Sequence, residues 1–106
     1  MYQRVYDFLL TIPKGKVVTY GQVAIAVFGS IGYSRAIGKI LHKNPDPDLY
    51  PCYKVVNASG RLAPAFAFGG QDVQKMLLEN DGIEVKDDFT VDIKKYIWCD
   101  ADMEIE

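Results

Sequence analysis

Two short amphipathic segments joined by a brief connection limit the possible folds of this chain more than any other feature. The string Thr19-Tyr20-Gly21-Gln22 fits a capping box, with Thr19 as the N-cap and Gln22 reaching back to it. A helix is expected from there to Gly29, a residue suited to a helix C-terminus. After a short connection, Ser34 can cap a second helix that runs to about Lys43. Two such helices in succession predict a helix-turn-helix.

The second helix of this pair has two unlike faces. The face opposite the apolar one is basic, because Arg35, Lys39 and either His42 or Lys43 recur at helical spacing. Gly38 lies on or near the basic face, where a glycine costs a helix roughly 1 kcal/mol relative to alanine. A glycine at this place indicates that something comes close to the backbone. The apolar face, expected to be buried, consists of Ala36, Ile37, Ile40 and Leu41.

Two further helices are expected. Residues Tyr2 to Thr11 carry an apolar stripe at helical spacing and predict the first. Asp72 to Asn80 predict the second, which should end at Asp81-Gly82. The side chains expected to turn inward from this second helix are Val73, Met76 and Leu77.

The predicted β component is small. Tyr53 to Val56 are expected to form a strand that pairs with Arg61-Leu62 as a hairpin, and residues 63–70 an ordered loop. Phe89, Val91 and Ile93 alternate with polar residues and predict one late strand. The fold class that follows is mainly α with a small β component, as a winged-helix-like helix-turn-helix domain.

Length and charge narrow the function. A chain of 106 residues allows a single domain over residues 1–106. Seven basic residues stand against three acidic ones up to Val56, whereas five basic residues face eleven acidic ones after it. A basic first half fits either a polyanion-binding surface or an ordinary solvated surface. No signal peptide or membrane-spanning run is recognisable, so a cytoplasmic protein without membrane contact is expected.

The cysteines and the histidine do not predict a metal site. Cys52 and Cys99 lie far apart and the chain has one histidine, which is not zinc-ligand spacing. No metal and no cofactor is therefore expected. Cys99 is expected to be a structural or surface thiol, and the acidic segment from Asp100 onward to be frayed.

Six motifs occur in a fixed order along the chain: Ile12 to Ala24, Ser34 to Gly38, Asn44-Pro45, Pro51 to Val56, Gly60, and Leu77-Leu78 with Gly82. Together they resemble one family, the carboxy-terminal domain of the O6-alkylguanine-DNA alkyltransferases and their alkyltransferase-like relatives. The resemblance spans about residues 2–82 and leaves 83–106 as a C-terminal extension. It implies a small winged-helix-like domain that binds the minor groove of double-stranded DNA and extrudes a damaged guanine.

The resemblance assigns DNA-binding roles to individual residues. Arg35 matches the arginine that enters the base stack and replaces the extruded nucleotide, where its long stem and guanidinium offset lost stacking and pairing. Tyr20 matches the tyrosine that crowds the adjacent phosphate. Both roles offset the free energy of base extrusion, which is a few kcal/mol. The full expected DNA-binding set is Thr19, Tyr20, Ser34, Arg35, Ala36, Gly38, Lys39 and His42.

Cys52 matches the acceptor that takes the alkyl group from the guanine oxygen in one irreversible step. Pro51, Cys52 and Val55 are expected to line the base pocket, and Asn44 matches the asparagine that supports the loop. Tyr53 replaces the histidine that the family places after its cysteine, and Asp81 stands at the position of the family's glutamate. A cysteine with an ordinary pKa near about 8.5 needs a base at neutral pH, and a phenol is a poor one.

Three functions remain open at this point. The first is a DNA-repair protein that recognises O6-alkylguanine by base flipping into a pocket at Cys52, with weak or absent transfer, and marks the lesion for nucleotide excision repair proteins. The second is a single-turnover methylated-DNA-protein cysteine S-methyltransferase in which Tyr53, Asp81 or a water replaces the base. The third is a winged-helix interaction protein without lesion recognition. A monomer is expected in each case.

Overall fold

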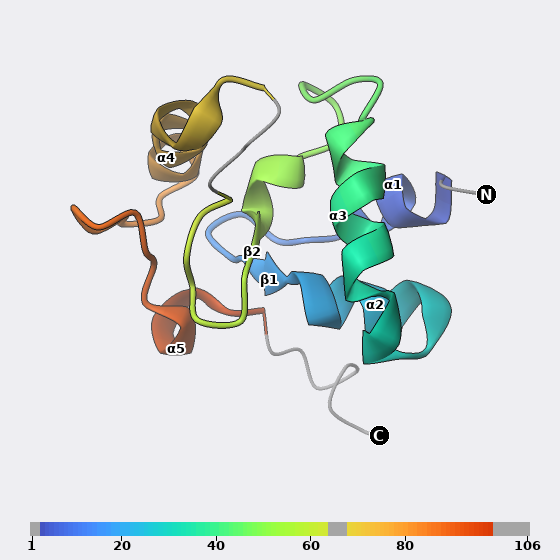
Figure 1. Ribbon diagram of the computed structural model, residues 1–106. Helices are drawn as coiled ribbons and strands as arrows, with labels where there is room; N and C mark the ends of the chain where they lie inside the picture. The colour runs from blue at the N-terminus through green and yellow to red at the C-terminus, as the bar shows by residue number, and fades with distance from the viewer. Residues whose placement is uncertain (1–2, 64–67, 99–106) are drawn as a thin grey trace.

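The computed structural model describes residues 3–63 and 68–98. Short helices dominate it, with two strands of two residues each (Figure 1). The α-helices are α1 (Gln3–Leu9), α2 (Tyr20–Phe28), α3 (Ser34–His42), α4 (Gly70–Asn80) and α5 (Ile93–Tyr96). The 3-10 helices are η1 (Ile31–Tyr33) and η2 (Cys52–Lys54), and the strands are β1 (Val18–Thr19) and β2 (Val55–Val56).

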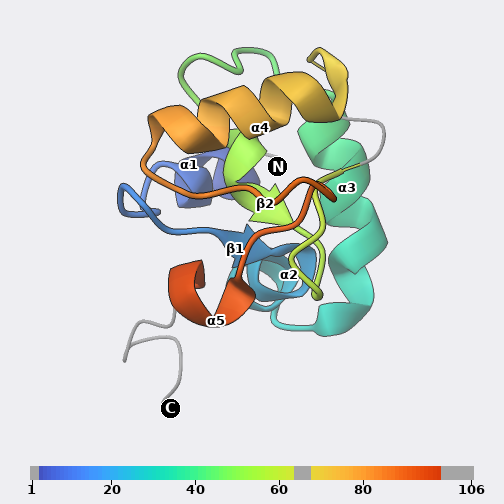
Figure 2. The ribbon, with the colours of Figure 1, turned by 90° about the vertical axis from the view of Figure 1, so that its left-hand side faces the viewer.

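The two strands lie in the middle of the molecule and pair in parallel, with Val18 opposite Val55 and Thr19 opposite Val56. Figures 1 and 2 show α1, α2 and α3 on one side of this pair and α4 and α5 on the other. The predicted fold class, mainly α with a small β component, is confirmed. The parallel pairing joins the start of the helix-turn-helix to the segment that follows Cys52.

Buried side chains form two clusters, one on each side of the strands. The first cluster contains the apolar faces of α1, α2 and α3 together with Cys52 and Val55. The second contains Val17, Val56, Leu62, Leu78, Ile83, Val85 and Val91. Of the apolar face predicted for α3, Ile37, Ile40 and Leu41 are buried there and Ala36 is half-buried.

Side chains of α1 fix the helix-turn-helix to the rest of the core. The Tyr6 hydroxyl donates to the carbonyl of Ile40 in α3 at 2.8 Å. The guanidinium of Arg4 donates to the carbonyl of Val27, in the last turn of α2, at 2.6 Å. These bonds satisfy backbone carbonyls and set the two helices against α1.

The capping signals were correct for α2 and wrong for α3. Thr19 accepts from the Gln22 nitrogen at 3.1 Å, and the Gln22 side chain accepts from the Thr19 nitrogen at 2.8 Å. Gly29 ends α2 in the left-handed conformation, with φ of 78°. Ser34 does not cap α3, because it is already helical and its hydroxyl donates to the Ile31 carbonyl. Ser30 instead caps η1, which occupies the expected connection.

The predicted hairpin is wrong. Tyr53 and Lys54 belong to η2, so the strand is limited to Val55–Val56, and its partner is β1. Arg61 instead forms an isolated antiparallel bridge with Thr90. The turn over residues 57–60 exists, and the Asn57 nitrogen donates to the Arg61 carbonyl at 3.0 Å, but among the described residues no strand follows the turn to pair with β2.

The expected late strand is also replaced. Among the described residues, the only β pairing in the range 89–93 is the isolated bridge of Thr90 with Arg61. Ile93 is the first residue of α5, and Asp92 is its N-cap. Phe89 has a positive φ of 60°, which interrupts an extended strand. Alternation of apolar residues here reflects burial of Val91 against the second cluster and not a long ladder.

The inward face of α4 is rotated from the prediction. Gln74 and Leu78 are its buried residues, whereas Met76 is 53% exposed and Val73 and Leu77 are half-buried. The helix does end at Asp81-Gly82 as expected, with Gly82 at φ of 85°. The rotation follows from the burial of a polar side chain, which apolar periodicity cannot register.

The segment after residue 82 is built into the domain. Val17 donates to the Tyr96 carbonyl at 2.9 Å, and Trp98 donates to the Val17 carbonyl at 2.8 Å, as in a parallel bridge between Val17 and Ile97. The Gln22 side chain also donates to the Trp98 carbonyl at 2.9 Å. Cys99, the segment from Asp100 onward and residues 64–67 of the expected loop lie outside the described residues.

No single helix in the described ranges has the length and apolar composition to cross a membrane. The helices over Tyr20–Phe28 and Ile31–His42 pass that test only as a pair, bent by 117°, on length and composition alone.

Candidate nucleic-acid interface and cysteine site

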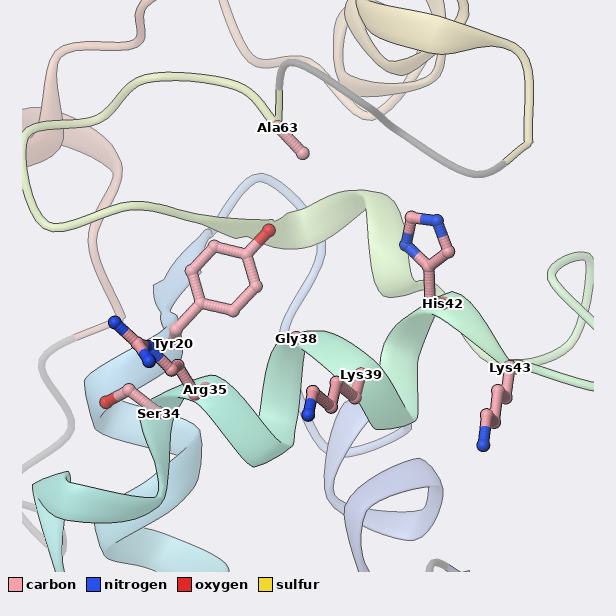
Figure 3. A pocket seen from close by; sticks show the side chains of 8 residues that line it. All are labelled: Tyr20, Ser34, Arg35, Gly38, Lys39, His42, Lys43 and Ala63. Carbon is pink, nitrogen blue, oxygen red and sulfur yellow. The ribbon is translucent and has the colours of Figure 1, made fainter.

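A groove of about 740 Å³ runs along the exposed side of α3. Figure 3 shows Ser34, Arg35, Gly38, Lys39, His42 and Lys43 along this helix, Tyr20 at one end and Ala63 on the opposite wall. Six of these eight residues belong to the DNA-binding set predicted from the sequence. Lys43 and Ala63 are additions. Lys43 was one of two candidates for the basic face, and no local signal marks Ala63.

The groove carries positive charge on the helix that forms its floor. Arg35 and Lys39 in α3 and Lys43 at its C-cap are exposed, so their charges add at short range. No carboxylate is among the described lining residues. An open basic groove of this kind suits the phosphate backbone of a nucleic acid.

Gly38 lies at the centre of this helix and lines the groove. A Cβ atom built at Gly38 would meet no protein atom within 4 Å, and its φ is not in the left-handed region. Neither backbone conformation nor packing inside the protein therefore requires glycine here. The glycine, which costs the helix roughly 1 kcal/mol relative to alanine, leaves the backbone of α3 bare in the groove.

Two predicted DNA-binding residues are not in the groove. The Thr19 hydroxyl is used as the N-cap of α2. Ala36 lies on another side of α3, where it lines a small cavity of about 130 Å³ with Lys39, Ile40 and Lys43. Lys39 and Lys43 therefore border both hollows.

Cys52 is the first residue of η2, and the chain around it is called the Cys52 turn below. Cys52 is 5% exposed, Val55 is 1% exposed and Pro51 is half-buried, and none of the three lines the described part of the groove. Asn44 is buried beside them. Its side chain donates to the Tyr50 carbonyl at 2.9 Å and accepts from the Asp46 nitrogen at 2.9 Å, which holds the proline-rich loop. The resemblance assigns Asn44 to support of this loop.

Burial governs the chemistry of the thiol. Removal from water raises the pKa of Cys52 above its ordinary value, and hydrogen bonds from Asn44 and from the cysteine's own backbone lower it in part. The net direction is upward, so the thiolate is scarce at neutral pH. The site contains the nucleophile in its less reactive form.

Two tyrosines are electrostatically coupled to Cys52. Burial raises the pKa of Tyr20, and the nearby Cys52 raises it further. Burial also raises the pKa of Tyr53, with added contributions from Asp81 and Cys52. Both phenols are therefore protonated at neutral pH and can donate hydrogen bonds but cannot take a proton from the thiol.

Asp81 is held by partners other than Tyr53. Its carboxylate lies 3.1 Å from the Lys54 ammonium and accepts from the Gly15 nitrogen at 2.8 Å. Lys54 also donates to the carbonyls of Pro13 at 3.1 Å and Ile12 at 3.5 Å. The pair ties the turn before β1 to the C-terminus of α4 and to η2.

Sequence reasoning missed the buried pair and also missed Gln74. The side chains of Lys54 and Asp81 are 6% and 12% exposed, which no local pattern indicates for charged residues. Gln74 is fully buried and bonds to backbone atoms of Tyr53, Val55 and Ala63. Within the described ranges, no group of three or more histidine, cysteine or carboxylate residues could hold a metal ion.

Comparison with known proteins places this geometry in a family. The model of "6-O-methylguanine DNA methyltransferase, DNA binding domain" matches residues 1–83. A DNA base-flipping protein of Vibrio parahaemolyticus is 36% identical over 97 residues, which cover 90% of this chain and 92% of that protein. A bifunctional methyltransferase/endonuclease of Picrophilus torridus is 38% identical over 96 residues, but the match covers only 31% of its length.

A solved structure agrees with this assignment. The S. pombe protein Atl1, in complex with damaged DNA containing O6-carboxymethylguanine, has a TM-score of 0.84 and 30% identity, covering 93% of this chain and 94% of that one. The similarity therefore extends past α4 into the segment that the sequence treated as an extension. The chain belongs to the family of the 6-O-methylguanine DNA methyltransferase DNA-binding domain.

Proposed function

We propose that this protein binds alkylated double-stranded DNA, recognises O6-alkylguanine, and turns the damaged base out of the duplex toward Cys52. It acts as an alkyltransferase-like protein, with weak or absent transfer of the alkyl group. The match over nearly the full length of a DNA base-flipping protein supports this class. The lesion then stays on the DNA, where the bound protein marks it for nucleotide excision repair proteins.

The observation that carries the proposal is the groove with Arg35 and Tyr20 at one end and Gly38 at its centre. The bare backbone at Gly38 allows α3 to approach the floor of a narrow groove. Arg35 is exposed and can enter the base stack, where a guanidinium stacks and donates hydrogen bonds at once. Tyr20 borders both the groove and the environment of Cys52, so it lies where a flipped base would pass.

The weak-transfer part of the proposal rests on the state of the thiol. A transferable alkyl carbon is attacked by a thiolate, and burial keeps Cys52 protonated. A positioned base contributes about 10² to 10⁴-fold to such a step. Tyr53 cannot act as that base, and Asp81 is already paired with Lys54.

The binding claim is tested by fluorescence anisotropy with matched duplexes that contain O6-methylguanine or guanine. We expect tighter binding to the methylated duplex, and Arg35→Ala should remove most of that preference. Lys94→Ala is the matched control, because it removes one exposed positive charge from α5, away from the groove. Equal affinity of the unaltered protein for both duplexes would refute lesion recognition and favour a winged-helix interaction protein.

The transfer claim is tested by incubation with an O6-benzylguanine duplex followed by intact mass measurement. An unchanged mass after long incubation is the expected result. A stoichiometric benzyl adduct on Cys52, absent in Cys52→Ala, would instead identify a working single-turnover transferase.

A further inference from the structure

Gln74 is the most completely buried polar side chain among the described residues. Asn44 and Lys54 keep 6% and 5% of their surface exposed, whereas Gln74 has 0%. It lies on the inward face of α4, one turn before Leu78. An amide without water requires hydrogen bonds inside the protein, so the partners of Gln74 indicate what it is for.

The partners belong to two segments on different sides of the site. The Gln74 side-chain nitrogen donates to the carbonyls of Tyr53 at 2.9 Å and Val55 at 3.3 Å, which lie one and three residues after Cys52. Its side-chain oxygen accepts from the Ala63 nitrogen at 2.9 Å. Both amide hydrogens and one acceptor position are used. One side chain therefore connects the Cys52 turn to the backbone at Ala63.

Ala63 forms the wall of the groove opposite α3 (Figure 3). Gln71 adds a second link from α4 to this wall, because its side chain donates to the Leu62 carbonyl at 3.2 Å. In the structure the spacing between the Ala63 wall and the Cys52 turn is therefore maintained from α4. A rigid amide bridge fixes such a spacing better than apolar packing, because hydrogen bonds are directional.

We propose that Gln74 is a positioning residue that sets the distance of the Ala63 wall from the Cys52 turn and thereby selects alkyl groups by size. The inference rests on the proposed function and adds the determinant of its substrate range. A wall held in one place excludes a bulky group by steric contact, whereas a wall that can move accommodates it. Gln74 itself touches no DNA, since it has no exposed surface.

The test measures the ratio of dissociation constants for duplexes with O6-benzylguanine and O6-methylguanine. Gln74→Met keeps the length of the side chain and removes all three hydrogen bonds. Leu78→Ala is the control. It weakens packing on the same buried face of α4, but the Leu78 side chain has no hydrogen bond to the Ala63 wall or to the Cys52 turn that the change could remove. We expect the ratio to change by about threefold or more in Gln74→Met and to stay unchanged in Leu78→Ala, whatever their melting temperatures.

A second measurement follows the wall itself. Hydrogen exchange of the Ala63 amide should accelerate in Gln74→Met and not selectively in Leu78→Ala, because the Gln74 oxygen accepts from that amide. If Gln74→Met does not fold, Gln74→Glu serves the same purpose. It keeps an acceptor for Ala63 but offers at most one O–H donor, when protonated, to the two carbonyls of Tyr53 and Val55, so the ratio should again change.

The outcomes separate this inference from the proposed function. Failure of the proposed function appears in the unaltered protein, as equal binding of methylated and undamaged duplexes. An unaltered protein that prefers methylated DNA but binds both adducts equally overturns size selection. An unchanged ratio in the Gln74 variants, or an equal change in Leu78→Ala, overturns the role of Gln74.

Discussion

Disruption of the buried Lys54–Asp81 pair should destabilise the protein strongly when one partner is changed and much less when both are. The two side chains are 6% and 12% exposed and their charged atoms lie 3.1 Å apart. Lys54→Met leaves the carboxylate with the Gly15 nitrogen as its remaining partner, and Asp81→Asn leaves the ammonium with two carbonyls. Each single change leaves a buried charge without its counterion.

The expected magnitude follows from that burial. Removal of one partner of a buried pair costs about 3 to 5 kcal/mol, and solvent screening discounts little of this at such low exposure. The remaining backbone partners place the estimate near the lower end, at about 3 kcal/mol. For a domain of this size that corresponds to a melting temperature lower by roughly 12 °C or more. The double variant buries no charge and should lose only about 1 to 2 kcal/mol.

Urea unfolding followed by tryptophan fluorescence measures all four proteins. Trp98 is the sole tryptophan of the chain, and its ring lies 5.8 Å from that of Phe8 at the edge of the first cluster. Single variants that lose under about 1 kcal/mol, or a double variant that loses the sum of both, would contradict the reasoning.

Three further outcomes are expected. Gly38→Ala should raise the free energy of unfolding by up to about 1 kcal/mol and weaken DNA binding, because the added methyl meets only the groove; unchanged affinity would argue against close approach there. Because burial raises the pKa of Cys52, Tyr20 and Tyr53, the unfolded chain ionises first, so stability should hold below about pH 8.5 and fall above it. Cys52→Ala should flatten the first part of that fall in urea titrations. Lys43→Ala should lower the logarithmic salt slope of binding by about 0.9 for damaged and undamaged duplexes alike, as measured by anisotropy across salt concentrations.

The parts of the fold that depend on neighbouring residues were predictable. The capping box at Thr19 and the left-handed Gly29 are the two ends of α2. Each is determined by residues within a few positions of it in the sequence. The basic face of α3 followed from helical spacing alone. Most residues that line the groove are therefore recognisable in the sequence.

The parts that depend on distant residues were not predictable. The parallel pairing of β1 with β2 joins segments far apart in the chain, and two-residue strands give no alternation to detect. From the sequence, Gln74 is expected at the surface because its side chain is polar. Its burial depends on hydrogen bonds to backbone groups of Tyr53, Val55 and Ala63, which only the fold brings near. The same holds for Lys54 and Asp81, because the burial of each charge depends on the ion pair with the other.

The docking of residues 96–98 on Val17 and Gln22 has a consequence for synthesis. The bond from Gln22 to Trp98 spans 76 positions of sequence, so the capping region of α2 leaves the ribosome long before its partner exists. Long-range closures of this kind slow folding, because chain entropy is lost before the contact forms. The helix-turn-helix is therefore synthesised before the segment that supports it.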